Sequence, residues 1–276
     1  MLGFGGNVTG FNVINYFSRN ADNFIIGRQL GATQLGFYDR AYRLLLFPIS
    51  MLSGPLGSVA IPTLCRLRKD RARLHRYYLN ILYLLSLFVA PVVGIAFVSS
   101  EPIVLLLLGS EWMPVSVAYR FLAIGGLLQP LYNTQSWLHI AGERSDRLLR
   151  WSCIGTPIII LSFLIGLPWG INGIALVYSL AIVFVTPASL WYAGNSVGLQ
   201  GMRMVRAVWR PIVACNLTVC LVLLLPFETV ANAGVALVRD AAFFLCIYVV
   251  LIILLYGGIR PYRDVVALLH LAREGR

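Results

Sequence analysis

The sequence predicts an all-α polytopic membrane protein, a helical bundle of about eight transmembrane helices. Three observations lead to this fold class. Hydrophobic residues make up 59% of the 276 residues and charged residues only 12%, which is about half the charged share of an average soluble chain. The mean hydropathy is +0.80. The apolar residues also form long runs whose connections alternate in charge, so lipid rather than a soluble core must receive most of these side chains.

Eight apolar segments can be read along the chain, and each is long enough, or nearly so, for the roughly 20 residues that a spanning helix needs. They cover residues 4–27, 31–65, 77–99, 114–141, 150–168, 170–194, 211–227 and 241–258. The second is too long for one perpendicular span and contains Pro48, Pro55 and Pro62. Because proline removes a helical hydrogen bond, this segment is predicted to be a long, kinked helix.

The connections indicate the orientation of the bundle. Sixteen of the 22 basic residues follow the second, fourth, sixth and eighth segments, whereas the connections after the third, fifth and seventh segments carry Glu101, Glu111 and Glu228 or no charge, with Arg239 and Asp240 at the edge of the last segment. By the positive-inside rule, the basic connections and both termini face the cytoplasm. The C-terminal stretch 261–273 places apolar residues at helical spacing and is expected to lie on the cytoplasmic membrane surface.

Several function classes lack support in the sequence. The net charge of +11 sits in loops between spans, so we expect no nucleic-acid partner. There is no Gly-Lys-Ser/Thr phosphate-binding loop and no paired carboxylate site, and the five cysteines show no metal-ligand spacing. We therefore expect no enzyme activity, catalytic residue, metal site or cofactor.

Polar residues inside the first segment are the first candidate site, because polar groups are costly in a membrane. On a helix, their spacing of three, four, three and one places them in one stripe. They are Asn12, Asn15, Arg19, Asp22 and Asn23. The stripe suits the wall of an aqueous cavity, in which Arg19 would offer its planar donor fork to a phosphate and Asp22 would orient that arginine. Hydrogen bonding between helices is the alternative.

Two further polar groups extend the candidate site. Arg40 and Arg43 begin the second segment beside tyrosines and suit an anionic headgroup or sugar diphosphate, or else anchor the helix at the membrane boundary. In the fourth segment, Gln129 and Asn133 recur at helical spacing next to Pro130. They line the same cavity in one interpretation and bond to neighbouring helices in the other.

The stretch from Asn15 to Ala32, followed by Leu35 to Arg43, resembles the polysaccharide exporters of the multidrug/oligosaccharidyl-lipid/polysaccharide (MOP) flippase superfamily. It is most similar to Wzx-type flippases of the colanic acid and exopolysaccharide branch. The segment Gly109-Ser110-Glu111-Trp112 and the turn Gly142-Glu143-Arg144 fit the same resemblance. Such proteins have two six-helix lobes, often followed by two more helices.

The resemblance implies a domain organisation. Residues 1–194 would form the second six-helix lobe, residues 195–258 the two additional helices, and residues 259–276 a cytoplasmic amphipathic tail. Alternating access requires two lobes. The chain is therefore expected to be a half or truncated protein that works with a missing N-terminal lobe or with a second copy.

The function implied is translocation of an undecaprenyl-diphosphate-linked oligosaccharide across the bacterial inner membrane, in exopolysaccharide, capsule or O-antigen assembly. Arg19, Arg40 and Arg43 would bind the diphosphate or acidic sugars, and Asp22 would orient Arg19 or respond to a coupling cation. Asn12, Asn15, Asn23, Gln129 and Asn133 would bond sugar hydroxyls. Partners would be the lipid-linked glycan, the bilayer and polysaccharide assembly proteins. The alternatives are a non-transporting scaffold of the assembly complex and a drug or metabolite exporter of the same superfamily.

Overall fold

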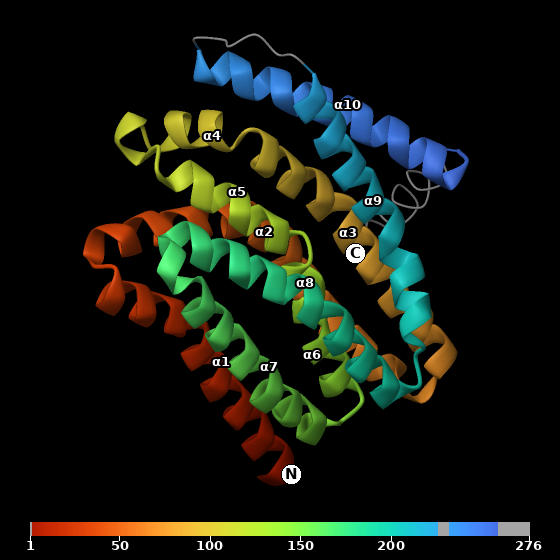
Figure 1. Ribbon diagram of the computed structural model, residues 1–276. Coiled ribbons are helices and arrows are strands. Elements are labelled where there is room, and N and C mark those ends of the chain that lie inside the picture. Colours follow the sequence, from red (N-terminus) through yellow and green to blue (C-terminus); the bar gives the residue numbers. More distant parts are fainter. Residues whose placement is uncertain (1, 226–231, 259–276) are drawn as a thin grey trace.

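The computed structural model describes residues 2–225 and 232–258, excluding the side chains of residues 2–4, 17 and 19. Throughout this part of the chain the regular structure is helical (Figure 1), which confirms the predicted all-α membrane bundle. The predicted amphipathic tail at 261–273 lies outside the described residues.

Ten α-helices and three short 3-10 turns follow one another along the described chain. The helices are α1 (Leu2–Gln29), α2 (Ala32–Arg66), α3 (Arg71–Val98), α4 (Ser100–Leu107), α5 (Val115–Gly126), α6 (Gln129–Ala141), α7 (Ser145–Gly166), α8 (Gly170–Val197), α9 (Gly201–Leu224) and α10 (Ala233–Tyr256). The 3-10 turns are η1 (Leu67–Lys69), η2 (Ser110–Trp112) and η3 (Leu167–Trp169).

Seven of the eight predicted segments each correspond to one helix, with ends that differ by up to ten residues, and α4 was not predicted. Five stretches of the described chain are long and apolar enough to cross a membrane, and the stretch 145–197 covers both α7 and α8. The predicted fourth segment, 114–141, is broken into α5 and α6. Gly125 and Gly126 weaken the end of α5, and Pro130 stands in the first turn of α6, where its missing N–H costs nothing.

Helix α2 continues as one helix through Pro48, Pro55 and Pro62, as the length of the second apolar segment predicts. Its buried positions, including Tyr38, Ala41 and Leu45, recur every three or four residues and face the bundle. The opposite face is exposed, so the two sides of α2 meet different surroundings.

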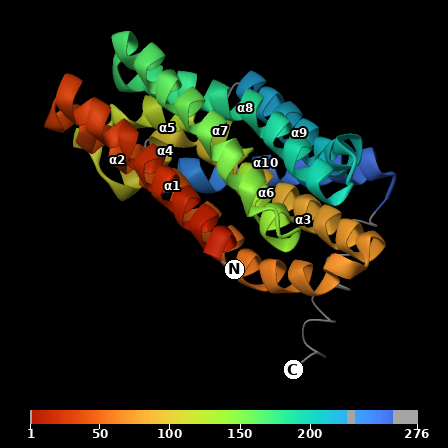
Figure 2. The same cartoon turned by 90° about the horizontal axis from the view of Figure 1, so that it is seen from below.

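Close approach between helices depends on small residues. A Cβ atom added to Gly125 of α5 would lie 2.9 Å from the Cα atom of Ser179 in α8, so α5 and α8 touch at the backbone level. Helix α8 also packs against α6 and α7, and α7 packs against α1. Figures 1 and 2 both show α1 beside α7. Small residues at contacts are typical of membrane helices, where van der Waals packing replaces the hydrophobic effect.

Helices α9 and α10 form a separate layer against α3, visible along one side of the bundle in Figure 1. Their apolar core includes Cys215 of α9 and Phe244 and Tyr248 of α10, together with Leu87 and Ala90 of α3. The Tyr248 hydroxyl donates to the carbonyl of Leu87 at 3.0 Å. Met204 and Val208 of α9 also pack against α8, but α9 and α10 contribute no residue to the cavity described below.

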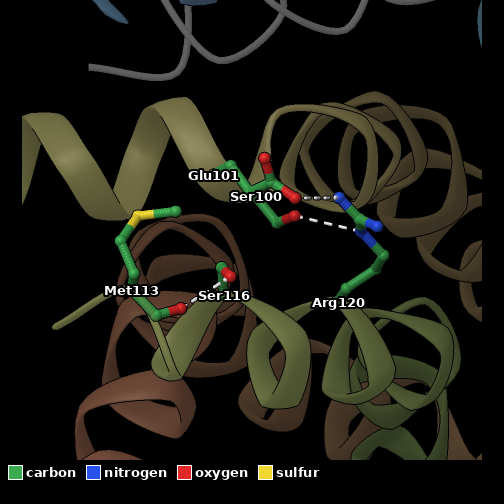
Figure 3. A network of polar contacts seen from close by, with 5 residues as sticks. All are labelled: Ser100, Glu101, Met113, Ser116 and Arg120. Carbon is green, nitrogen blue, oxygen red and sulfur yellow. Dashed lines mark hydrogen bonds and ion pairs between the residues drawn. The ribbon is translucent and has the colours of Figure 1, made fainter. Parts of the chain in front are cut away.

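Arg120 joins α5 to α4 at the end of the bundle opposite the basic connections. Its Nε atom donates to the hydroxyl of Ser100 at 3.0 Å and its guanidinium pairs with Glu101 at 3.4 Å (Figure 3). A second hydrogen bond, from the Ser116 hydroxyl to the carbonyl of Met113, closes the first turn of α5. These contacts fold the short α4 back onto α5.

Replacement of Phe244 by alanine is expected to loosen the α3–α10 contact. The ring is fully buried and covers Gly94, so Phe244→Ala leaves a cavity and is expected to lower the free energy of unfolding by about 3–5 kcal/mol. Phe243→Ala is the matched control, because the neighbouring ring is 47% exposed. Thermal unfolding in detergent should show a larger loss for Phe244→Ala, and equal losses would contradict the assignment of this contact.

Candidate functional site: a polar cavity within the bundle

A cavity of about 370 Å³ lies among α1, α2, α6, α7 and α8. Its lining is rich in hydroxyl, amide and aromatic groups. The lining residues are Phe11, Asn15, Ser18, Asp22, Tyr42, Ser53, Gly54, Gln129, Pro130, Tyr132, Asn133, Gln135, Ser136, Trp137, Trp151, Ser152, Thr156, Ile159, Phe163, Tyr178 and Ile182. Polar groups at such density in a membrane bundle have to meet one another or water, because lipid offers no hydrogen bonds.

Four of the residues predicted from the sequence meet in this cavity. Asn15 and Asp22 reach it from α1, and Gln129 and Asn133 reach it from α6. The two α1 residues stand seven positions apart, which is nearly two helical turns, and the two α6 residues stand four apart. Their positions therefore agree with the interpretation that they line a cavity. For Gln129 the alternative, hydrogen bonding to neighbouring helices, also holds.

Three side chains form a hydrogen-bonded group at the wall of the cavity. The Nε2 atom of Gln129 donates to the Tyr42 hydroxyl at 2.8 Å and to the Tyr178 hydroxyl at 3.2 Å, and the two hydroxyls lie 3.3 Å apart. Tyr178 also stacks on Phe163, with ring centroids 5.4 Å apart. This group joins α2, α6 and α8, so it holds the amide and both hydroxyls in defined positions toward the cavity.

Asp22 is the one acidic residue of the lining. Its side chain is buried, and Oδ1 accepts the backbone N–H of Asn23 at 2.8 Å. Arginine and lysine are absent from the lining as described. The predicted partner of Asp22, the side chain of Arg19, lies outside the described residues, although its position on α1 is known.

Arg40 and Arg43 lie outside this cavity. Arg40 rests on the ring of Trp112, with its Cζ atom 5.7 Å from the ring centroid. Arg43 pairs with Asp39 one turn earlier at 2.8 Å, and its side chain is 73% exposed. Because Tyr38 and Tyr42 face the bundle, helical geometry turns positions 40 and 43 away from it.

Asn12 and Asn23 also stand apart from the lining. Asn12 is exposed and Asn23 is half-buried. The predicted α1 stripe therefore divides into two adjacent faces. Residues 11, 15, 18 and 22 face the cavity at heptad spacing, and residues 12 and 23 occupy the face next to them.

Sequence reasoning missed the contribution of α7 and α8. Trp151, Ser152 and Thr156 line the cavity from α7, and Tyr178 lines it from α8. These residues are scattered in apolar segments without a helical stripe of polar residues. Gln135 of α6 was also missed, although an amide within an apolar segment is itself a signal.

These features define a class: a multi-pass membrane protein with the fold of MOP flippases. The solved structure of the lipid II flippase MurJ in an inward closed conformation superimposes with a TM-score of 0.72, over 93% of this chain and 53% of that chain, at 17% identity. A likeness at this identity establishes the fold.

The sequence is similar to proteins of polysaccharide biosynthesis. The family described as polysaccharide biosynthesis protein matches residues 1–117. The teichuronic acid biosynthesis protein TuaB of Bacillus subtilis (strain 168) is 27% identical over 140 residues, which are 50% of this chain and 29% of TuaB. The lipopolysaccharide biosynthesis protein WzxC of Escherichia coli (strain K12) is 25% identical over 212 residues, 76% of this chain and 43% of WzxC.

These matches confirm the resemblance to polysaccharide exporters of the MOP superfamily expected from the sequence. The chain spans less than half the length of the two curated relatives and about half of the structural one.

Water access distinguishes the cavity wall from the lipid-facing surface. In a background without native cysteines, Asn133→Cys in the cavity is expected to react with a membrane-impermeant thiol reagent, since thiolates form in water and not in lipid. Leu161→Cys is the matched control, because this α7 side chain is 53% exposed on the apolar outer surface. Equal labelling of the two variants, measured by mass spectrometry, would show that the cavity is not hydrated.

Proposed function

We propose that this chain forms one lobe of a membrane flippase that translocates a lipid-linked oligosaccharide for the assembly of a bacterial exopolysaccharide, capsule or O-antigen. The observation that carries the proposal is the polar cavity inside a MOP-flippase fold. Its relatives take part in polysaccharide biosynthesis, and the lining has the chemistry that a sugar requires.

The cavity suits a sugar ring better than a phosphate. Sugars present hydroxyl groups around an apolar ring face, so their sites combine amide and hydroxyl partners with aromatic side chains. Asn133 and Gln135 supply amides beside Trp137 and Trp151. We propose that Asn15, Gln129 and Asn133 bond sugar hydroxyls.

A diphosphate would need cationic partners, which the described cavity lining does not contain. Arg40 and Arg43 lie on α2 outside the cavity. We propose that these two arginines contact the anionic part of the substrate from outside the sugar cavity and that Arg19 contributes to the same binding. Asn12 and Asn23 would then contact sugars beyond the ring held in the cavity, and Asp22 would orient Arg19 or respond to a coupling cation.

Translocation by alternating access needs two lobes that move around a shared site. We propose that this lobe works beside another, supplied by a separate lobe or by a second copy of the chain. The bundle would lie in the bacterial inner membrane with its basic connections and both termini in the cytoplasm, as the positive-inside rule predicts. Other polysaccharide assembly proteins would act on the same lipid-linked glycan.

Export of a cationic drug or metabolite is the second candidate function, and one observation favours it. Asp22 supplies the single charge of the described cavity lining, and that charge is negative when the carboxyl group is ionised. Two of the arginines that argue against a cationic ligand in the sequence, Arg40 and Arg43, lie outside the cavity. A cationic dye such as ethidium therefore tests this alternative directly.

Replacing Gln129 by leucine should weaken glycan binding. The change removes the amide that holds both tyrosine hydroxyls, and one lost hydrogen bond of about 1.4 kcal/mol corresponds to about tenfold in affinity. Binding of an undecaprenyl-diphosphate-linked glycan to the purified full chain can be followed by tryptophan fluorescence, because Trp137 and Trp151 line the cavity.

Asn216→Leu is the matched control, since this exposed amide bonds only within its own helix α9. Equal affinity of both variants and the unaltered chain would contradict a glycan site in this cavity. Binding of ethidium that is lost in Asp22→Asn, without glycan binding, would instead support the exporter alternative.

A further inference from the structure

A second, smaller pocket lies where three connections meet on the side that the charge pattern assigns to the cytoplasm. It has a volume of about 160 Å³ and is bounded by the α2–α3, α6–α7 and α8–α9 connections. Arg68 and Arg71 enter it from the first connection, Gly142 and Glu143 from the second, and Ser196 from the end of α8. It is separate from the sugar cavity, with which it shares no lining residue.

Polar contacts hold the three connections together at this pocket. Arg68 forms an ion pair with Glu143, and His75 of α3 bonds through Nε2 to the carbonyl of Val197 at 3.0 Å. Glu143 has a left-handed backbone with φ of 54°, an unfavourable conformation for a residue other than glycine. The ion pair therefore links two connections whose geometry is not set by helix formation alone.

The pocket carries an excess of positive charge. Arg68 uses part of its donor fork on Glu143, and Asp70 pairs with Arg73 at 3.2 Å. Among the described residues, no carboxylate forms an ion pair with Arg71. The N-terminus of α3 is capped by Asp70, whose carboxylate accepts the backbone N–H of Arg73, so the positive charge of the pocket comes from the arginines.

The size and position of the pocket limit the kinds of ligand that it can bind. Its volume of about 160 Å³ is well above the space that one water molecule needs, which leaves room for a group of the size of a phosphate. It lies at the ends of the apolar segments that form α2, α3, α6 and α8, hence at the depth of lipid headgroups. Basic pockets between helices on the cytoplasmic side of a membrane are suited to anionic lipid headgroups.

We propose that this pocket binds the phosphate group of an anionic phospholipid of the cytoplasmic leaflet. Arg71 presents its planar fork to the phosphate oxygens, and Arg68 contributes the donors that Glu143 leaves unused. The phosphate and Glu143 compete for Arg68, so an occupied pocket weakens the contact between the α2–α3 and α6–α7 connections. Lipid composition would thereby act on the cytoplasmic ends of α2 and α6, two of the helices that line the sugar cavity.

Native mass spectrometry of the full chain, released from detergent micelles containing phosphatidylglycerol, tests the proposal. We expect one tightly bound phosphatidylglycerol and no such binding of phosphatidylcholine. Arg71→Gln should weaken the binding by about tenfold, and Arg71→Lys by less, because lysine keeps the charge and loses the fork. Arg150→Gln is the matched control: it removes the same charge from an exposed site on the same side and should change the affinity by less than about twofold.

Glu143→Gln supplies a test with the opposite sign. Removing the competing carboxylate frees Arg68, so the affinity for phosphatidylglycerol should rise by about threefold, an increase that misfolding would not produce. Equal weakening in Arg71→Gln and Arg150→Gln would overturn the proposal in favour of diffuse surface attraction. Binding of inorganic pyrophosphate that depends on Arg71, without binding of phosphatidylglycerol, would overturn the lipid assignment in favour of a soluble phosphate.

Discussion

The structure depends on the inability of lipid to form hydrogen bonds with the polar side chains that its helices carry. In a bilayer, each such group needs a partner from the protein or from enclosed water. The two hydrogen bonds from Gln129 to Tyr42 and Tyr178 give partners to polar side chains of three helices at once. It fixes the rotation of α2, α6 and α8 about their axes, and with it the set of side chains that face the cavity. The outward faces of α7 and α8 are then left to residues such as Leu161 and Phe184, which are exposed.

The same constraint places the neutral polar side chains and the arginines of this lobe in different regions. The cavity lining combines amides, hydroxyls and aromatic rings with one carboxyl group, whereas Arg40 and Arg43 have their partners at Trp112 and Asp39 on the far side of α2. Burying an arginine without a partner would be costly, and an exposed position keeps it hydrated. A lipid-linked glycan has both neutral sugars and an anionic linkage, so a lobe that handles it would benefit from two such chemically distinct regions.

Much of the fold could be predicted because helices in lipid must be apolar and long. The composition, the apolar segments and the alternating charge led to the helices found. The break between Gly126 and Gln129 was not predicted, since the segment 114–141 is apolar enough to be one helix, and the glycines and Pro130 decide the break locally. For the site, the helical spacing of polar residues was sufficient to predict that Asn15, Asp22, Gln129 and Asn133 line a cavity. Asn12 and Asn23 lie outside the lining because the α1 stripe is broader than one helical face, and Arg40 and Arg43 lie outside it because Tyr38 and Tyr42 occupy the inward face of α2.

By itself, the sequence determined the class of protein: an all-α membrane bundle, its helical segments, the side that carries the basic connections and its resemblance to polysaccharide exporters. These properties follow from residue types and local spacing. Only the tertiary structure decided that α7 and α8 complete the cavity with Trp151 and Tyr178, and that residues 68, 71 and 143 share one pocket. The physical reason is that helix spacing determines which residues share a face, whereas contacts between helices far apart in sequence determine what each face meets.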